Sequence, residues 1–515
     1  MTDEAAFGLA LFEGGDQGAA GATAPPPDDQ RQAAMRIAAG LREAGVDLTA
    51  GTSLPDAARE RRTMAVVGRA GTGKTRILAG LVAALREAGV EAISAEDERK
   101  AKGRRSVAIL APTNKAASVL RARGVPATTI HRILYTPLYH PDFEKLADWL
   151  SGKADRPEVE GVADGALDRA AASYALHGSL PGALAAAGLR GSDFIKGWKR
   201  RDSPLDIGLV DEASMLDEAM LADLESLFGF LLLFGDPAQL PPPMGQGEGM
   251  VFDRLPPKDR LELSTVHRQA EGNPILDLAL ALGDPDIDFP DFEREIERAA
   301  SRDDRVVVAG RADADGMARA PILVWRNATR VRLIDAFRRS HGAPEAELLP
   351  GEPLICDGLE LPRQHFRRRG ELETRGLVKG AQVIWLGPGR KPGFSRLHVL
   401  GADPPGVTAA TIIRLEAPDR EEPVIASAAR MGASFVHGAA VTIHKAQGSQ
   451  WPEVQVFAPD LYAAFRSGRS EAGVALWRRL AYVAITRAEH RLVWVTRAAL
   501  ARPRQPLAAK PVEGE

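Results

Sequence analysis

The strongest candidate for chemistry is a glycine-rich segment near residue 70. Its sequence, Gly68-Arg69-Ala70-Gly71-Thr72-Gly73-Lys74-Thr75, fits the pattern G-x-x-x-x-G-K-[ST] at every fixed position. Glycines let backbone N–H groups curl around phosphate oxygens without a Cβ clash, and the helix expected next adds the partial positive charge of its N-terminus. We therefore expect a nucleotide-binding loop in which Lys74 reaches the β- and γ-phosphates of ATP and the Thr75 hydroxyl binds Mg²⁺.

Two adjacent carboxylates at the end of an apolar run are the expected partners of that loop. Leu209-Val210-Asp211-Glu212 is typical of a buried strand that ends in acidic residues. Asp211 would hold Mg²⁺, directly or through water, and Glu212 would polarise the attacking water as a general base. The alternative is an acidic pair that stabilises a helix dipole. The phosphate loop upstream favours the catalytic interpretation.

A third candidate is the proline-stiffened loop that follows the apolar run at 230–234. Gln239 in this loop could sense a γ-phosphate, because its amide offers both donors and an acceptor. On spacing alone, a plain turn led by Asp236-Pro237 is the favoured interpretation.

The elements that must position these residues are visible in the hydrophobic pattern. The first block has expected strands at 64–67, 106–110, 206–210 and 230–234, and helices at 29–45, 76–87 and 115–121. A second α/β block starts near Glu262, with strands at 305–309, 322–325, 438–443, 454–458 and 491–495 and a helix at 329–340. Short Gly/Pro-punctuated strands at 382–386, 396–400 and 408–415 indicate a small β-barrel inserted within it.

Taken in order, the motifs resemble those of the superfamily 1 helicases, in particular the RecD-like and Dda/Pif-type branch. The resemblance spans roughly residues 29–498. Besides the phosphate loop, it is carried by the segments 111–117, 129–134, 211–215, 235–240, 263–269, 441–450 and 482–488. The last two, Val441 to Gln450 and Tyr482 to Ala488, are the most specific for the superfamily. The resemblance as a whole implies an AAA-type P-loop ATPase with a UvrD-like C-terminal helicase domain.

The resemblance also implies roles for individual residues. Arg268 would contact ATP from the second domain, Arg487 would be an arginine finger, and Gln30 would read adenine, with Gln32 as an alternative. The implied catalytic set is Lys74, Asp211, Glu212, Gln239, Arg268 and Arg487. The implied nucleotide-binding set is Gln30, Gly68, Gly71, Thr72, Gly73, Lys74, Thr75, Arg268, Gly448 and Arg487, with Thr75 and Asp211 as metal ligands.

Single-stranded DNA is the implied track. Pro112, Thr113, Lys115 and His131 would hold the strand on one domain, and Thr442, His444 and Lys445 on the other. His131 alone would more often be a hydrogen-bonded turn or core histidine. Phe194, Trp198 and the basic residues 196 and 199–201 could stack on bases and bind phosphates, although a solvated basic linker around two core aromatics is at least an equal alternative.

The predicted fold class is α/β, with two RecA-like P-loop NTPase domains, a small insertion in the first and an SH3-like β-barrel inserted in the second. The expected parts are a disordered leader (1–28), a first RecA-like domain (29–261) with an insertion that is a possible pin subdomain (140–205), a second RecA-like domain (262–351 and 431–500), the barrel (352–430) and a flexible tail (501–515). In relatives the insertion carries a strand-separating pin, but no clear hairpin stands out within residues 140–205.

Composition is compatible with these expectations. The formal net charge of −3 conceals segregation, since residues 1–60 hold 4 basic and 10 acidic side chains and residues 205–262 hold 3 and 12. The remainder is therefore basic overall, which permits a DNA track. The one cysteine, Cys356, excludes an internal disulfide framework and fits a reducing compartment. The acidic N-terminal opening is a poor secretion signal, and no run approaches 18 apolar residues. We expect a cytoplasmic monomer without a membrane contact.

These observations lead to one main functional hypothesis and two alternatives. The first is an ATP-dependent DNA helicase that acts on single-stranded DNA and single-strand/duplex junctions, with 5′→3′ movement implied by the resemblance. The second is a single-strand DNA translocase or DNA-dependent ATPase subunit of a larger recombination or nuclease complex. A binding module with an inactive ATP site is disfavoured by the intact Lys74, Asp211, Glu212 and Arg487. A protein partner in recombination or replication is possible, and the sequence does not choose among repair, recombination and replication.

Overall fold

The computed structural model describes most of the 515 residues. The described ranges are 27–53, 61–93, 104–139, 141–159, 162, 164–177, 183, 195–242, 249–265, 272–360, 372–373, 375–419, 423–429 and 432–507. The chain forms two compact units. The first contains Met1–Leu134, Arg201–Ala309 and Ile443–Thr496, and the second contains Tyr135–Arg200, Gly310–Thr442 and Arg497–Glu515. The predicted leader falls almost wholly outside the described residues, as do the last residues of the predicted tail.

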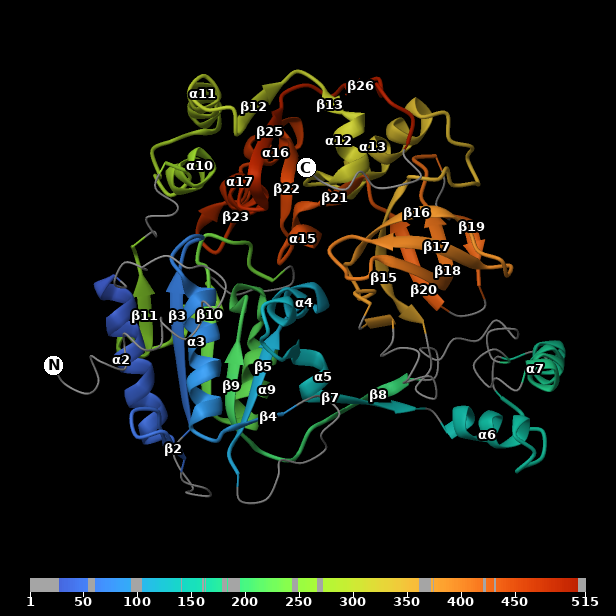
Figure 1. The fold of residues 1–515 in the computed structure, drawn as a ribbon, viewed down its shortest axis with the longest axis horizontal. Coiled ribbons are helices and arrows are strands. Elements are labelled where there is room, and N and C mark those ends of the chain that lie inside the picture. Colours follow the sequence, from blue (N-terminus) through green and yellow to red (C-terminus); the bar gives the residue numbers. More distant parts are fainter. Residues whose placement is uncertain are drawn as a thin grey trace. The chain divides into compact units, whose positions relative to one another are not determined.

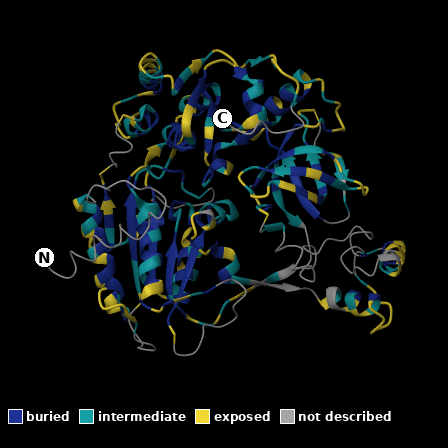
Figure 2. Cartoon of the chain, viewed as in Figure 1, coloured by how far each residue is buried: buried dark blue, intermediate teal, exposed yellow. Residues whose placement is uncertain are grey.

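The first unit contains a parallel seven-stranded sheet of order β11-β3-β10-β9-β5-β4, with β6 paired to β5. The strands are β3 (Arg62–Gly68), β4 (Glu91–Ala92), β5 (Ser106–Ala111), β6 (Ala127–Thr129), β9 (Leu205–Val210), β10 (Phe228–Gly235) and β11 (Arg260–Leu263). Its central strands are almost continuously buried, as expected for a parallel sheet covered on both faces (Figure 2). Parallel strands align their carboxyl ends, so the loops that follow β3, β9 and β10 leave the sheet at one edge.

Helices cover this sheet (Figure 1). They are α2 (Asp28–Glu43), α3 (Lys74–Glu87), α4 (Asn114–Ala122), α5 (Ile130–Leu134) and α9 (Glu218–Leu227), together with the short 3-10 turns η2 (Ala213–Met215), η3 (Val251–Arg254) and η4 (Pro257–Asp259). The predicted apolar face of α2 is buried in the sheet's core. At Gly40 of this helix a Cβ would lie 2.8 Å from Met64 Sδ, so only glycine allows the close approach to β3. A two-stranded ribbon, β1 (Val46–Asp47) with β2 (Thr52–Ser53), follows α2.

A second group of parallel strands completes the first unit. It consists of β12 (Val306–Ala309), β25 (Ala488–Val495) and β22 (Trp451–Phe457), paired in that order. The accompanying elements are α10 (Pro274–Ala281), α11 (Phe289–Ala300), α15 (Ile443–Ala446), α16 (Ala458–Arg466), α17 (Leu476–Ile485) and the ribbon of β23 (Ser470–Glu471) with β24 (Val474–Ala475). Phe289 lies at the centre of an aromatic cluster with Tyr462, Phe465, Trp477 and Trp494. The C-terminal segment, residues 443–496, is therefore an integral part of this unit.

The second unit carries a closed arrangement of antiparallel and parallel strands. Its members are β15 (Pro353–Glu360), β16 (Gln382–Pro388), β17 (Phe394–Val399), β18 (Gly406–Leu415), β19 (Val424–Ala428) and β20 (Gly432–His437). The pairings run β15-β16-β17-β18-β20 and return to β15, so five strands form a ring, and β19 is added to β18. Alternate residues of β18 are buried inside the ring, which is the pattern of a small barrel.

Other elements of the second unit flank this ring. Parallel strands β14 (Ile322–Val324) and β21 (Ala440–Thr442) pair, as do β13 (Ala312–Asp313) and β26 (Leu500–Ala501). The helices are α12 (Ala314–Arg319) and α13 (Asn327–Ser340). Residues just beyond β26 are held as well, since the Arg504 guanidinium and backbone N–H both bind Asp315.

The insertion differs from the sequence-based expectation. Strand β7 (Tyr135–Tyr139) pairs antiparallel with β8 (Ile195–Arg200), and the helices α6 (Pro141–Leu150) and α7 (Asp164–His177) lie between them in the chain. The sequence prediction that no clear hairpin stands out concerned residues 140–205, whereas β7 lies just before that range, so this pairing was not anticipated. The two strands are joined by more than fifty residues, so no tight-turn signal marks their pairing.

No helix among the described residues is both long and apolar enough to cross a membrane.

Candidate nucleotide and nucleic-acid site

The phosphate loop, residues 68–75, connects β3 to α3 as the pattern predicts. Gly71 and Gly73 have φ values of 83° and 86°, in the left-handed region that favours glycine. The Lys74 ammonium donates to the backbone carbonyl of Arg69 at 2.9 Å and to that of Gly68. The Thr72 hydroxyl donates to the Arg69 carbonyl at 2.8 Å, while Thr75 lies in the first turn of α3. This geometry is that of a phosphate cradle at a helix N-terminus.

The start of α2 holds the phosphate loop from a distant part of the sequence. Gln30 is fully buried, and its amide donates to the Thr72 carbonyl at 2.8 Å. Gln32, the alternative, is exposed. The geometry thus favours Gln30 as the glutamine beside the nucleotide.

Asp29, which sequence reasoning missed, holds another segment. Its Oδ2 accepts from the backbone N–H groups of Ser264 and Thr265, each at 2.8 Å. Burial alone would raise the pKa of Asp29, but these hydrogen bonds outweigh it and lower that pKa. The segment leads toward Arg268, which lies outside the described residues.

The acidic pair follows β9. The Asp211 N–H donates to Leu110 of the neighbouring strand β5 at 2.9 Å, and Asp211 Oδ1 accepts from the Glu212 N–H at 3.0 Å. Burial raises the pKa of Asp211 to about 7, and the nearby Glu212 carboxylate contributes to the shift. Glu212 itself has φ 53° and ψ 39°, a left-handed conformation that costs a non-glycine residue about 1–3 kcal/mol. Such strain is concentrated at functional sites.

Gln239 lies against the acidic pair rather than in a solvent-exposed turn. Its amide nitrogen donates to Glu212 Oε2 at 3.0 Å, although the residues are 27 positions apart. Gln239 is 5% exposed, and its buried Oε1 has no hydrogen-bond partner among the described residues. The Gln239 amide is thus held through its nitrogen on Glu212, the predicted general base, and its oxygen remains available as an acceptor.

The donor set fits Mg²⁺ as it usually binds beside phosphates. This ion keeps several waters and takes one or two protein oxygens together with substrate phosphates. The Thr75 hydroxyl and the Asp211 carboxylate are such oxygens. The Asp211 carboxylate, whose pKa is raised beside a second carboxylate, would also be stabilised by a nearby cation. No cluster of three or more His, Cys, Asp or Glu side chains suited to a metal ion occurs in the described part of the chain, so a protein-only cage is not present there.

Arg487 follows α17 and is buried. Its guanidinium donates to the carbonyls of Val483 and Ser449 and to the Thr486 hydroxyl, each at 3.1 Å. These partners belong to the C-terminal segment and not to the phosphate loop. Gly448, which was predicted to contact the nucleotide, has φ 72°, and a Cβ there would lie 3.2 Å from Ala116 Cβ and 3.5 Å from Thr113 Oγ1. Gly448 therefore approaches α4 closely.

Six of the seven predicted DNA contacts belong to the first unit, and Thr442 belongs to the second. Thr113 caps α4, since its hydroxyl accepts from the Ala116 N–H at 3.1 Å. Burial lowers the pKa of Lys115, of His131 and of His444. Burial therefore favours the neutral form of both histidines, and in that form a DNA contact would rest on hydrogen bonds or stacking rather than on charge. Lys445 is exposed.

The structure describes only part of the predicted basic and aromatic cluster. Phe194 and the side chains of Lys196 and Trp198 lie outside the described residues. Arg201 donates to the carbonyl of Ile133 at 3.0 Å, which is a structural contact within the first unit.

Sequence reasoning missed three further residues that contact the loop around Gln239. They are Tyr482, Arg479 and Gln447, all in the C-terminal segment. Tyr482 lies within the segment 482–488, which carries the family resemblance. Its place in that motif could have marked it as a functional residue, whereas its residue type could not.

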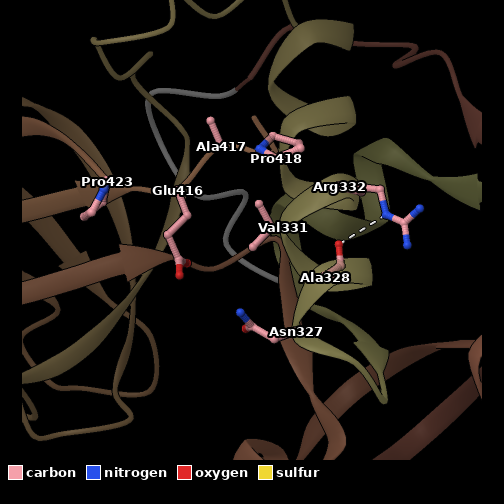
Figure 3. Close-up of a pocket in the computed structure, with 8 residues that line it drawn as sticks. All are labelled: Asn327, Ala328, Val331, Arg332, Glu416, Ala417, Pro418 and Pro423. Carbon is pink, nitrogen blue, oxygen red and sulfur yellow. Dashed lines mark hydrogen bonds between the residues drawn. The ribbon is translucent and has the colours of Figure 1, made fainter. Parts of the chain in front are cut away.

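A pocket of about 320 Å³ lies elsewhere, in the second unit (Figure 3). It is lined by the start of α13 and the chain around Glu416, and Arg332 donates to the Ala328 carbonyl at its edge. It shares no residue with the predicted site.

Two family matches follow the order of the motifs along the chain. Residues 55–309 match the family described as AAA domain, and residues 437–495 match the UvrD-like helicase C-terminal domain. No protein of curated function matches the sequence significantly. Among solved structures, the Pif1 helicase from Candida albicans is 15% identical with a TM-score of 0.44, and covers 92% of this chain and 95% of its own. Bacteroides Pif1 bound to single-stranded DNA is 13% identical with a TM-score of 0.42, and the alignment covers 84% of this chain and 88% of the other.

Proposed function

We propose that this chain is an ATP-hydrolysing DNA helicase of superfamily 1, of the Pif1- and RecD-like type. The matches to the AAA domain and to the UvrD-like helicase C-terminal domain support this proposal. In the proposed reaction cycle, ATP hydrolysis drives movement along single-stranded DNA and separation of duplex strands. The observation that carries the proposal is Gln239, because this buried amide lies on Glu212 while its loop is held by the UvrD-like segment. The proposed hydrolytic site is thereby in contact, within one unit, with the segment that matches the UvrD-like helicase C-terminal domain.

The hydrolytic step assigns one task to each side chain. Glu212 accepts a proton from the attacking water, and the free Oε1 of Gln239 helps to orient that water. Lys74 binds the β- and γ-phosphates and stabilises the charge that develops on them. Mg²⁺, held by Thr75 and Asp211, would supply further charge stabilisation at the phosphates.

Arg268 and Arg487 would complete the stabilisation of the transition state. Arg487 must first exchange one or more of its hydrogen bonds to Val483, Ser449 and Thr486 before it reaches a phosphate. An arginine finger contributes about 10³–10⁵ in rate, so such an exchange is an effective control point.

DNA would bind across Pro112, Thr113, Lys115 and His131 and across Thr442, His444 and Lys445. The close contact of Gly448 with α4 supports a continuous track, because it joins the two groups of DNA-binding residues in the first unit. Backbone contacts make such binding largely independent of base sequence and sensitive to salt. We assign 5′→3′ polarity.

The finer parts of the proposal follow the sequence predictions. We assign two RecA-like domains with the boundaries given above, and the ring of β15 to β20 as an SH3-like insertion. We also propose a monomer that acts at single-strand/duplex junctions in repair, recombination or replication, with a possible protein partner. A cytoplasmic location is supported by the single buried thiol of Cys356.

ATP hydrolysis with and without single-stranded DNA tests this function. The wild-type protein should hydrolyse ATP faster when DNA is added. Lys74→Ala should lose hydrolysis by at least about 100-fold, because the cation that stabilises the charge on the transferred phosphate is removed, while single-strand binding persists. Lys145→Ala, which removes an exposed lysine paired to Asp142 on α6, is the matched control. A wild-type rate of ATP hydrolysis that is the same with and without single-stranded DNA would contradict the proposal.

A further inference from the structure

The loop Asp236–Leu240, here called the glutamine loop, is held at several points by the C-terminal segment. We infer that Tyr482 and Arg479 are positioning residues that fix the glutamine loop on Glu212 and thereby make ATP hydrolysis depend on the segment that carries DNA contacts. The inference rests on the proposed function and adds a role for two residues outside the phosphate- and DNA-binding sets.

Tyr482 joins the glutamine loop to the phosphate loop. Its hydroxyl donates to Asp236 Oδ2 at 2.7 Å and accepts from the Ala70 N–H at 2.8 Å. Tyr482 is 2% exposed and Asp236 is 1% exposed. Burial, followed by the Asp236 charge, raises the pKa of Tyr482 well above its ordinary value, so the hydroxyl keeps its proton and remains a donor. One buried oxygen therefore connects α17 to both loops.

Asp236 also organises the start of the glutamine loop. Its Oδ1 accepts from the Ala238 N–H at 3.0 Å. Its backbone N–H donates to the Ser214 hydroxyl at 2.8 Å, and that hydroxyl donates to the Asp236 carbonyl at 2.9 Å. Ser214 lies two residues after Glu212. A shift of Asp236 would therefore move both the segment that carries Gln239 and the segment that carries Glu212.

Arg479, one turn earlier on α17, holds the middle of the loop. Its guanidinium donates to the carbonyls of Pro237 at 2.9 Å and of Gln239. It also donates to the carbonyls of Glu471 at 2.9 Å and Ala472 at 3.2 Å in the β23–β24 ribbon. All four acceptors are backbone carbonyls. Because a planar guanidinium has five donors in a fixed fork, it can bridge two separate segments, whereas a lysine ammonium presents its three donors from one point.

Gln447 completes the connection. Its amide donates to the Leu240 carbonyl at 3.2 Å, at the end of the glutamine loop. Gln447 directly follows α15, the helix that contains His444 and Lys445. DNA that displaces α15 would therefore move the glutamine loop, which orients Gln239. Because Tyr482 and Arg479 also attach the glutamine loop to α17, the loop would shift together with the C-terminal segment instead of changing shape on its own.

Tyr482→Phe tests the inference with the smallest possible change. It leaves the ring in place but removes the donor to Asp236 and the acceptor for Ala70, two buried groups that then lose a partner. The matched control is Tyr462→Phe on α16, since Tyr462 is 46% exposed. We expect the stimulation of ATP hydrolysis by single-stranded DNA to fall about 10-fold in Tyr482→Phe, with the KM for ATP and DNA affinity without nucleotide changed less than about 3-fold. The control should behave as wild type.

A double-mutant cycle separates coupling from a general structural effect. If Tyr482 acts through Asp236, then Tyr482→Phe and Asp236→Asn together should reduce stimulation little more than either change alone. Arg479→Lys should give the same loss of stimulation and serves in place of Tyr482→Phe if that variant does not fold, as judged by circular dichroism.

Three results would overturn the inference. They are normal DNA stimulation in both Tyr482→Phe and Arg479→Lys, an equal fall of the DNA-independent and DNA-stimulated rates, and additive effects in the cycle. A wild-type enzyme that is not stimulated by DNA would instead refute the proposed function, and the inference with it. That outcome is recognised before any variant is made.

Discussion

In the proposed mechanism, Glu212 is the residue on which the chemical step depends most directly. It combines a left-handed backbone conformation, a hydrogen bond from Gln239 and a neighbour, Asp211, whose pKa is raised to about 7 by burial. Each feature restricts where its carboxylate can lie. The strained backbone is offset by the surrounding contacts, which is the usual arrangement where a catalytic group must be held in one position.

Glu212→Gln should therefore separate ATP binding from hydrolysis. The amide keeps the size of the side chain and can still accept from Gln239, but it cannot take a proton from water. We expect the hydrolysis rate to fall by about 10²–10⁴, the usual contribution of general base catalysis, with ATP affinity nearly unchanged. Single-turnover hydrolysis and binding of a fluorescent ATP analogue measure the two quantities. Glu218→Gln on α9 is the control, and retention of full hydrolysis in Glu212→Gln would exclude the general-base role.

At this scale the sequence predicted where the glycine-rich loop and the acidic pair lie, and it missed their distant contacts. Lys74, Thr75, Asp211 and Glu212 are recognisable because a strand, a turn and a helix adjacent in sequence position them. The role of Tyr482 depends on Ala70 and Asp236, which are 412 and 246 positions away along the chain. No spacing rule joins such residues. Gln239 shows the intermediate case, since its spacing favoured a plain turn and only the packing places it on Glu212.

Among the elements, the start of α2 has an unexpected double role. Gln30 holds the phosphate loop and Asp29, its neighbour, holds residues 264 and 265, which lead toward Arg268. A single helical turn thus fixes two segments that the resemblance assigns to nucleotide binding.

Asp29→Ala should weaken ATP binding more than turnover. The change removes two hydrogen bonds to a charged acceptor, each of a kind worth about 1.5–3 kcal/mol, so we expect the KM for ATP to rise about 10-fold or more. Steady-state hydrolysis over a range of ATP concentrations provides KM and kcat. Asp28→Ala is the matched control, because Asp28 is exposed and pairs with Arg31 on the surface. An unchanged KM in Asp29→Ala would show that residues 264 and 265 do not need this anchor.

Helices and strands could be predicted from the sequence where a single continuous segment, such as an apolar run or a glycine-rich turn, defines them. The apolar runs at 206–210 and 230–234 predicted β9 and β10 to within two residues, and the glycine-rich turn predicted the start of α3. The β7–β8 ribbon was missed because its pairing depends on strands that are far apart in sequence. The basic residues of β8 were interpreted as a charged cluster, and the segment was not predicted to be a strand.

For the whole molecule, the second unit depends on a buried ionic cluster. Glu352 accepts from Arg338 Nε at 3.0 Å, from His437 Nε2 at 2.8 Å and from the Leu349 N–H at 2.8 Å. Arg338 belongs to α13, whereas Glu352 directly precedes β15 and His437 is the last residue of β20. The cluster therefore joins the ring of strands to its neighbouring helix.

Glu352→Gln should destabilise this unit by about 3–5 kcal/mol at pH 7, since removal of one charge leaves Arg338 buried without its carboxylate. Burial opposes ionisation, but His437 and Arg338 outweigh it and lower the pKa of Glu352 from 4.5. Its stabilising contribution is therefore complete above pH 4.5 and is lost as the pH falls through the lower folded value. Urea unfolding at pH 7 and below pH 4 should show a large difference that narrows in acid. Glu347→Gln, whose side chain is exposed, is the control, and a difference that widens in acid would refute the assignment.

The central claim is that this molecule couples ATP hydrolysis to movement along single-stranded DNA with separation of the duplex ahead. The most direct test is strand displacement by the purified protein on two duplexes of the same sequence, one with a 5′ tail and one with a 3′ tail, with Lys74→Ala in parallel. We predict ATP-dependent displacement of the 5′-tailed duplex, little displacement of the 3′-tailed duplex and none by Lys74→Ala. Displacement of neither duplex by a protein that hydrolyses ATP in response to single-stranded DNA would contradict the claim.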